Sequence, residues 1–322
     1  MMLTFVIILL SCNTTTTKKK INGAEITLPP IPAKAGGDKQ DTICSFHKIS
    51  KSASVNLSQE FTDVNYTFLY DNILYLMGSG AKSILMMDTG TGEIRKSNKL
   101  NKLISSISVK LGFPGLLSIT KDRIYVGFDK GIVCMDKEYK ILYQIQVFYN
   151  NFVVKQSGQL IVFGDSYWSI YDAEGALIKK AARDTDVLHF YKSNDGFYCD
   201  DDLVLKKIDI NADTLAKSEV GPTTRFAGFD PNNDYPAFIT KDYIVWTNFA
   251  KRDKLTITDK TMKIVKVIPL KGVNWAMTKE ELNDAAGNPT FFVDINGDSF
   301  FASVYKNNSL LVYKGCLGLK NH

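Results

Sequence analysis

The sequence predicts an all-β protein made of six copies of one four-stranded sheet, and three observations lead to that prediction. Short apolar runs separated by turn residues fill the chain after residue 60, with almost no helical periodicity. These runs fall into six segments of one plan, in which the second apolar run often ends in Asp. The composition, 45% hydrophobic and 23% charged, is typical of a folded domain and excludes a disordered chain.

The first segment, residues 1–11, is predicted to be a signal peptide. Residues 3–10 are apolar except for one threonine, a stretch well below the roughly 20 residues that span a bilayer as a helix. The Leu-Leu-Ser-Cys stretch at 9–12 is similar to the lipobox of bacterial lipoproteins, although no Lys or Arg precedes the apolar run. That resemblance implies that the Cys12 thiol is acylated and anchors the chain to a membrane. The alternative is an N-terminal hydrophobic strand with a structural cysteine.

Residues 12–41 are predicted to form a flexible tether. They contain four consecutive threonines, three consecutive lysines and several Pro and Gly residues, without hydrophobic periodicity. Such a segment cannot bury enough apolar surface to offset the entropy lost on ordering. Residues 42–322 then form the folded domain, which the tether would hold away from the membrane.

Each of the six copies contains a hairpin of nearly constant length. The hairpins run from Ile73 to Asp88, Ile124 to Asp136, Leu160 to Asp172, Phe197 to Asp209, Ile244 to Asp259 and Phe300 to Tyr313. We expect the recurrent Asp to form the next turn, because an Asp carboxylate accepts hydrogen bonds from backbone amides two residues further on. These Asp residues are therefore not candidates for catalysis.

A further strand before each hairpin completes each sheet, and radial packing of such sheets gives a β-propeller. The strands expected to be innermost cover residues 115–120, 151–155, 186–192, 236–240 and 290–294. The sixth copy ends after its third strand, so we expect residues within 43–61 to supply the missing outer strand. This closes the ring and removes an open edge, which would favour aggregation.

The repeat pattern resembles six-bladed propellers of the NHL, YWTD and quinoprotein-like type, including the propeller lipoproteins of Bacteroidetes. The resemblance covers residues 42–316 and rests on diffuse motifs, with no WD dipeptide and no kelch double glycine. It implies an exported, lipid-anchored protein of the bacterial cell envelope, at the outer membrane on its periplasmic or surface side. It also implies that a ligand binds at one mouth of the ring.

The loops predict which mouth that is. Turns between the first and second strands are short, whereas the long connections, 97–114, 218–235 and 269–289, all belong to the opposite end of the ring. Aromatic rings beside Arg and carboxylate groups suit a sugar or a peptide. The candidate ligand-binding residues are Tyr167, Asp201, Arg225, Phe226, Phe229, Asp230, Arg252 and Trp275. The alternative is that these loops are simply polar and that their aromatic residues cover blade edges.

Once Cys12 is assigned to the lipid, four cysteines remain. Cys44 lies in the predicted closing segment, and Cys316 lies just beyond the strand with which that segment would pair. An exported compartment permits a Cys44–Cys316 disulfide, and the alternative is four buried thiols. We expect Cys134 and Cys199 to be packing residues.

The sequence favours a noncatalytic binding module for a protein or glycan, without a cofactor or a metal site. Only three His occur, and no Ser/His/Asp set can be assembled by spacing. Residues 294–298 imitate the start of a calcium loop but are predicted to be a turn. The alternative is a calcium-dependent propeller hydrolase, lactonase or lyase that uses channel-facing Asp groups and His189. A net charge of +5 without a clustered basic face argues against nucleic acid as a partner.

Overall fold

The chain divides into two compact units, Met1–Ile43 and Cys44–His322. The computed structural model describes residues 19–21, 24–26, 46–50, 64, 66–78, 83–155, 157–182, 190–194, 196–201, 204–211, 214–220, 234–248, 251–271, 291–306 and 309–319. In the first unit, β1 (Lys19–Ile21) pairs with β2 (Ala24–Ile26) in an antiparallel hairpin. This hairpin lies in the segment for which the sequence predicts a tether without regular structure.

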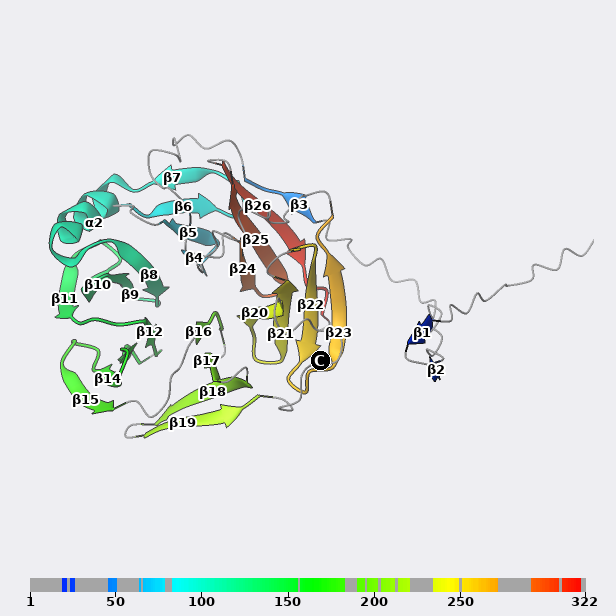
Figure 1. The fold of residues 1–322 in the computed structure, drawn as a ribbon. Helices are drawn as coiled ribbons and strands as arrows, with labels where there is room; N and C mark the ends of the chain where they lie inside the picture. Colours follow the sequence, from blue (N-terminus) through cyan, green and yellow to red (C-terminus); the bar gives the residue numbers. More distant parts are fainter. Residues whose placement is uncertain are drawn as a thin grey trace, which may run out of the picture. The chain divides into compact units, whose positions relative to one another are not determined.

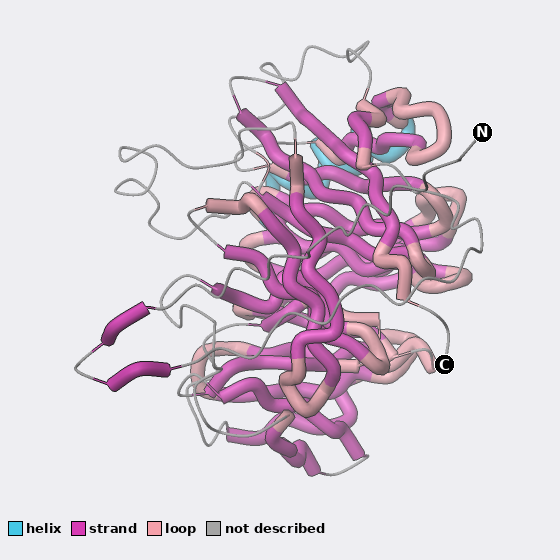
Figure 2. The backbone as a smooth tube through the Cα atoms, turned by 90° about the vertical axis from the view of Figure 1, so that its right-hand side faces the viewer, coloured by secondary structure: helices cyan, strands magenta, loops and turns pink. Residues whose placement is uncertain are grey.

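The second unit is a ring of six four-stranded antiparallel sheets (Figure 1). Strands are the main element of the described chain, and short loops join them at their ends (Figure 2). Blade 1 contains β4 (Tyr66–Tyr70), β5 (Ile73–Met77), β6 (Leu85–Asp88) and β7 (Ile94–Lys96), and blade 2 contains β8 (Pro114–Ile119), β9 (Arg123–Phe128), β10 (Gly131–Asp136) and β11 (Ile141–Gln146). Blade 3 contains β12 (Asn151–Val154), β13 (Leu160–Phe163), β14 (Tyr167–Tyr171) and β15 (Leu177–Ala182), and blade 4 contains β16 (Phe190–Tyr191), β17 (Phe197–Asp201), β18 (Val204–Asn211) and β19 (Thr214–Glu219). Blade 5 contains β20 (Asp234–Ile239), β21 (Tyr243–Asn248), β22 (Lys254–Asp259) and β23 (Ile264–Pro269), and blade 6 contains β24 (Phe291–Asn296), β25 (Ser299–Lys306), β26 (Ser309–Cys316) and β3 (His47–Lys48). The predicted six-bladed β-propeller is confirmed.

The ring closes as predicted, through a strand from the N-terminal side of the domain. β3 pairs antiparallel with β26, with Lys48 opposite Tyr313. The backbone N–H of Ile49 donates to the Val312 carbonyl at 2.8 Å, and the Val312 N–H donates to the Ser50 hydroxyl at 3.1 Å. These bonds occupy the outer edge of β26, which would otherwise expose unpaired backbone groups.

The hydrophobic core is divided into six clusters, and each cluster lies between two neighbouring blades. The alternation of side chains along a strand explains this division. In β9, for example, Ile124 and Val126 pack toward blade 1, whereas Tyr125 between them packs toward blade 3. Both faces of an inner hairpin are therefore buried, which is why its sequence is almost continuously apolar.

The Asp that closes the third strand forms the turn that follows it, as predicted. The Asp136 carboxylate accepts the backbone N–H of Glu138 at 3.0 Å and that of Lys140 at 2.8 Å. The same arrangement recurs at Asp172 and Asp259, and Asp88 accepts from two amides as well. The repeat therefore marks a structural turn in these four blades.

The connection between blades 1 and 2 differs from the prediction of a long loop. It contains α2 (Asn98–Leu111), a helix capped by the Ser97 hydroxyl and followed by Gly112 at a φ of 85°. Leu100, Ile104, Ile107 and Leu111 are buried in the cluster between the two blades, so the connection fills a wedge in the core. Of the three long connections that the sequence assigns to one end of the ring, the one at 97–114 is therefore a packed helix and not a loop.

Candidate functional site

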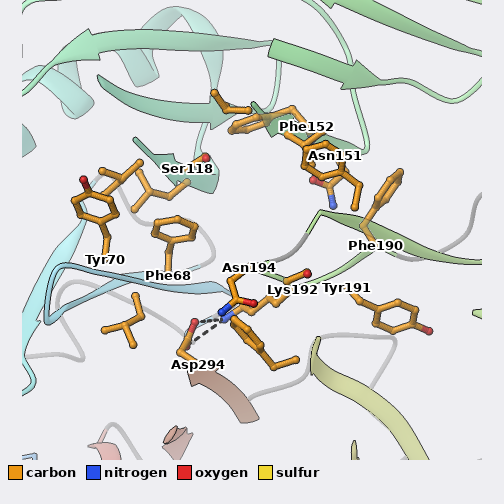
Figure 3. Close-up of a pocket in the computed structure, with 18 of the residues that line it drawn as sticks. Phe68, Tyr70, Ser118, Asn151, Phe152, Phe190, Tyr191, Lys192, Asn194 and Asp294 are labelled. Carbon is orange, nitrogen blue, oxygen red and sulfur yellow. Dashed lines mark hydrogen bonds and ion pairs between the residues drawn. The ribbon is translucent and has the colours of Figure 1, made fainter. Parts of the chain in front are cut away.

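A cavity of about 660 Å³ lies at the centre of the ring. Its walls come mainly from the innermost strands β4, β8, β12 and β16, with contributions from β20 and β24 (Figure 3). The volume lies within the range of about 300 to 1,000 Å³ that is typical of pockets for small ligands. Because the walls belong to six different blades, the ring as a whole holds the pocket in shape.

The pocket reaches the end of the channel that carries the short turns. Thr120 and Lys121 line it from the turn between β8 and β9, and Asn194 and Gly196 line it from the turn between β16 and β17. Lys121 and Asn194 are also the exposed residues among those that line it. The pocket therefore opens at the short-turn end, whereas the sequence predicts a site at the long-loop end.

A buried polar cluster of Thr67, Lys192 and Asp294, called the Lys192 cluster below, crosses the channel. The Lys192 Nζ donates to Thr67 Oγ1 at 2.6 Å and lies 3.1 and 3.2 Å from the two Asp294 oxygens (Figure 3). Thr67 Oγ1 in turn donates to Asp294 Oδ2 at 2.5 Å. Thr67 belongs to β4 and Asp294 to the inner strand β24, and Lys192 directly follows β16, so the cluster ties blades 1, 6 and 4 together.

The surroundings of the Lys192 cluster are apolar, which affects its charges. The Asp294 side chain is 3% exposed and the Lys192 side chain 20% exposed. Burial lowers the pKa of Lys192, while the neighbouring carboxylate of Asp294 acts in the opposite direction. The rings of Tyr66 and Phe292 lie 5.3 and 5.2 Å from the ammonium nitrogen and add favourable cation–π contacts. The charges of Lys192 and Asp294 therefore neutralise each other inside the pocket.

Tyr66 connects the Lys192 cluster to the opposite wall. Its hydroxyl donates to the Leu117 carbonyl of β8 at 3.2 Å. Burial raises the pKa of this hydroxyl well above its usual value, and the negative charge of Asp294 adds to the effect. The phenol therefore stays protonated and serves as a hydrogen-bond donor.

The remaining walls combine aromatic rings with neutral polar groups. Phe68, Phe152 and Phe190 surround the cavity, and the carboxamide of Asn151 lies among them (Figure 3). Asn151 Oδ1 accepts the backbone N–H of Phe152 at 2.7 Å, which fixes the carboxamide on the pocket wall. Ser118 adds a hydroxyl. Apolar faces beside amide and hydroxyl groups can bind a ligand that has both kinds of surface.

The sequence-predicted ligand residues that can be placed do not line this pocket. Tyr167 begins β14, where its hydroxyl donates to the Phe148 carbonyl and Lys180 lies 4.0 Å from its ring. Arg252 is only 2% exposed and lies over the Phe291 ring at 5.7 Å. Asp201 is the last residue of β17. The three lie on different blades, and the structure does not bring them together.

The other sequence-predicted residues lie mostly outside the described part of the chain. These are Cys12, Cys44, Arg225, Phe226, Phe229, Asp230 and Trp275, together with His189. Cys316 is disulfide-bonded, and its partner also lies outside the described residues. The pairing with Cys44 therefore stays a prediction. Cys134 and Cys199 are buried thiols in the clusters on the two sides of blade 3.

Two absences hold for the described residues. These residues contain no group of three or more His, Cys, Asp or Glu side chains placed to hold a metal ion, and Asp294 instead pairs with Lys192. The segment that imitates a calcium loop, residues 294–298, consists of the end of β24 and the turn that leads to β25. In the same part of the chain, no helix has the length and apolar character needed to cross a membrane.

Three residues of the pocket and its Lys192 cluster, Tyr66, Thr67 and Lys192, were not predicted from the sequence. Lys192 lies at the end of a strand predicted to be innermost, and this position was a usable signal. A lysine in a strand that faces the channel must find a partner, because a buried charge is costly without one. Thr67 and Tyr66 carry no comparable signal.

Known proteins resemble this chain in fold and not in sequence. No protein-family model matches the chain, and no curated protein matches its sequence. Among solved structures, a Bacteroides fragilis protein described as a candidate exported protein matches with a TM-score of 0.50 and 10% identity, covering 87% of this chain and 97% of that one. At this identity, the likeness shows the fold alone.

Two further matches have TM-scores below 0.5, and nothing is concluded from them. Regucalcin from Agrobacterium tumefaciens, described as a calcium-binding protein, has a TM-score of 0.47 and 12% identity over 80% of this chain and 91% of its own. A structure of a nidogen–laminin complex has a TM-score of 0.41 and 12% identity over 62% of this chain and 76% of that one. The six four-stranded sheets of the chain itself, and not a sequence match, place it among the six-bladed β-propellers.

Proposed function

We propose that the protein is an exported, lipid-anchored and noncatalytic binding protein whose ligand, a protein or glycan, occupies the central pocket. The observation that carries this proposal is the pocket itself, with about 660 Å³ of space, aromatic walls and an opening at the short-turn end. The walls are strands of a closed ring, and a rigid wall loses little conformational entropy when a ligand binds.

Two observations support export. Cys316 is disulfide-bonded, and disulfides persist mainly in oxidising compartments outside the cytosol. The Bacteroides fragilis protein with the same fold is described as a candidate exported protein. Together with the lipobox-like residues 9–12, they favour an anchor at Cys12.

The arrangement of the Lys192 cluster supports binding without catalysis. The ammonium group and the carboxylate bind each other, and the threonine hydroxyl bridges them. A general base needs a free acceptor directed at substrate, and a nucleophilic lysine needs to lose its proton readily. Here Asp294 opposes the lowering of the Lys192 pKa by burial, and the carboxylate and the ammonium group are already engaged with each other. The cluster therefore shapes and neutralises the pocket.

The experiment tests the pocket and the anchor separately. Ser118→Trp fills the pocket, and Ser106→Trp, on the exposed face of α2, is the matched control. In thermal-shift measurements with glycan and peptide libraries, we expect at least one probe to stabilise the wild type and Ser106→Trp but not Ser118→Trp. A complete lack of stabilised probes would contradict a pocket ligand. For the anchor, Cys12→Ser should move the protein from the membrane fraction to the medium or periplasm.

A further inference from the structure

The charges inside the pocket restrict the chemistry of its ligand. Among the described residues that line the pocket, the interior ones carry one positive and one negative side chain, Lys192 and Asp294, which lie in contact with each other. Lys121 is a further charged lining residue, but it lies at the exposed opening. The interior is therefore electrically neutral. An anionic ligand group near the ammonium would also meet the carboxylate, and a cationic group would meet the ammonium.

The neutral polar groups of the walls match sugar hydroxyls. A hydroxyl both donates and accepts a hydrogen bond, as do the carboxamide groups of Asn151 and Asn194 and the hydroxyl of Ser118. Asn151 Oδ1 is already bound to the Phe152 amide, so its NH₂ group is the part that can serve a ligand. This group donates to a hydroxyl oxygen without requiring charge.

The aromatic rings match the other surface of a sugar. Phe68, Phe152 and Phe190 lie around the cavity on three different blades (Figure 3). A pyranose ring presents a face of C–H groups that stacks on an aromatic ring, while its hydroxyls point outward around the edge. A fatty chain would leave the amides unpaired in an apolar contact, which is costly. A peptide has no comparable flat apolar face in its backbone.

From these observations we propose that the central pocket binds an uncharged sugar unit of a glycan, which reaches it through the short-turn end. The proposal rests on the proposed function, since it names the ligand class of the same pocket. The exposed Lys121 and Asn194 at the opening would contact the part of the glycan that remains outside.

The test uses the full chain and matched oligosaccharides. One set contains uncharged oligosaccharides of glucose, galactose, mannose and N-acetylglucosamine. The second set contains the same compounds with the terminal sugar replaced by its uronic acid. By calorimetric titration, we expect an uncharged member to bind at least tenfold more tightly than its uronic acid partner, and Ser118→Trp to abolish that binding.

Charge variants of the Lys192 cluster sharpen the test. Asp294→Asn keeps a hydrogen-bonding side chain but leaves the ammonium of Lys192 without its counter-charge, so we expect the preference to shift at least tenfold toward the uronic acid. In Lys192→Met/Asp294→Asn the interior is neutral again, and the preference should return to the uncharged member. If the single variant does not fold, the comparison in the wild type decides alone.

The outcomes separate the two proposals. A wild type that binds a peptide or a uronic acid through the pocket would overturn the uncharged-sugar proposal and leave the binding function intact. A wild type that binds no member of any library would overturn both. Uncharged-sugar binding that persists in Ser118→Trp would place the sugar elsewhere and overturn the assignment of this pocket.

Discussion

The recurring turn aspartates are the clearest case in which a single residue type determines local structure. In blades 2, 3 and 5 the turn residue with positive φ is Tyr139, Gly175 or Met262, and in each case an Asp carboxylate three residues earlier accepts two backbone amides. The carboxylate accepts hydrogen bonds from backbone amides of the turn that have no partner strand. Tyr and Met can therefore take a conformation that is otherwise favourable mainly for glycine.

At this scale we predict that Asp259 makes the fold sensitive to acid. Hydrogen bonds from the Thr261 hydroxyl and from the amides of Lys263 and Thr261 hold the pKa of Asp259 below its usual value. Such a group stabilises the fold above the unfolded-state pKa, and this stabilisation disappears as the pH falls through the lower folded-state pKa. Asp259→Asn keeps an acceptor oxygen but does not titrate, so it should lose less stability than the wild type between pH 5 and pH 2.

Urea unfolding at several pH values measures this difference. Asp259→Ala is the comparison, because it removes the acceptor and should be less stable than the wild type at neutral pH as well. Parallel pH curves for the wild type and Asp259→Asn would show that this carboxylate contributes nothing to acid sensitivity.

The aspartates were predictable from sequence, whereas the Lys192 cluster was not. An Asp turn depends on atoms within four residues of each other, so a repeated local pattern reveals it. Thr67, Lys192 and Asp294 meet only because the ring closes, and the residues that interact are 102 to 227 positions apart. Asp294 was assigned to a turn because its neighbours in sequence resemble one. Its partner lies on another blade.

At the scale of elements, α2 is the part of the fold that departs most from the prediction. Its apolar positions follow the spacing of one helix face, at Leu100, Leu103, Ile104, Ile107 and Leu111. That signal was present, but the segment was predicted only as a long connection between two blades. Strand patterns in the rest of the chain strengthened this interpretation.

The helix is bound to blade 1 through one polar residue. Asn101 is 4% exposed, and its carboxamide accepts the backbone N–H of Ile84 at 2.6 Å and donates to the Ile84 carbonyl at 3.2 Å. It therefore extends the hydrogen-bonding pattern of the sheet just before β6 begins. The helix is therefore hydrogen-bonded to the residue that precedes β6, and it also packs on the core.

We predict that Asn101→Ala lowers the free energy of unfolding by about 2 to 3 kcal/mol, because it leaves a buried N–H and a buried carbonyl without partners. Lys102→Ala, at the adjacent exposed position, should change it by less than about 0.5 kcal/mol. Chemical denaturation of both variants gives the comparison. Equal effects at the two positions would show that the Asn101 contacts do not hold the helix.

At the scale of the whole molecule, the ring was predicted correctly in blade number, in strand order and in the source of its closing strand. These features depend on a repeat count and on the need to satisfy the last edge, and both can be read from a sequence. The sequence predicts a ligand site at the long-loop end, and the central pocket was not predicted, because loop length does not indicate the width of the channel. The short inner strands β12 (Asn151–Val154) and β16 (Phe190–Tyr191) help to frame the cavity.

We predict that loss of the closing strand converts the molecule into an associating species. A chain that begins at residue 62 lacks β3 and exposes the edge of β26, whereas a chain that begins at residue 42 keeps the closure. Size-exclusion chromatography with light scattering should show oligomers for the shorter chain and monomers at the same concentration for the longer one. A shorter chain that remains monomeric and equally stable would show that β3 is dispensable.

The span of the Lys192 cluster has a consequence for biosynthesis. Thr67 belongs to the first blade, and Asp294 belongs to the last, 227 positions later. A ribosome makes the N-terminal blades first, so the polar wall of the pocket comes into existence only when the final blade has been added. A chain cut short before Asp294 would expose an unbalanced lysine and an incomplete cavity. Ligand binding is thus a property of finished molecules alone, and it can serve in the laboratory as a readout of full-length, correctly closed protein.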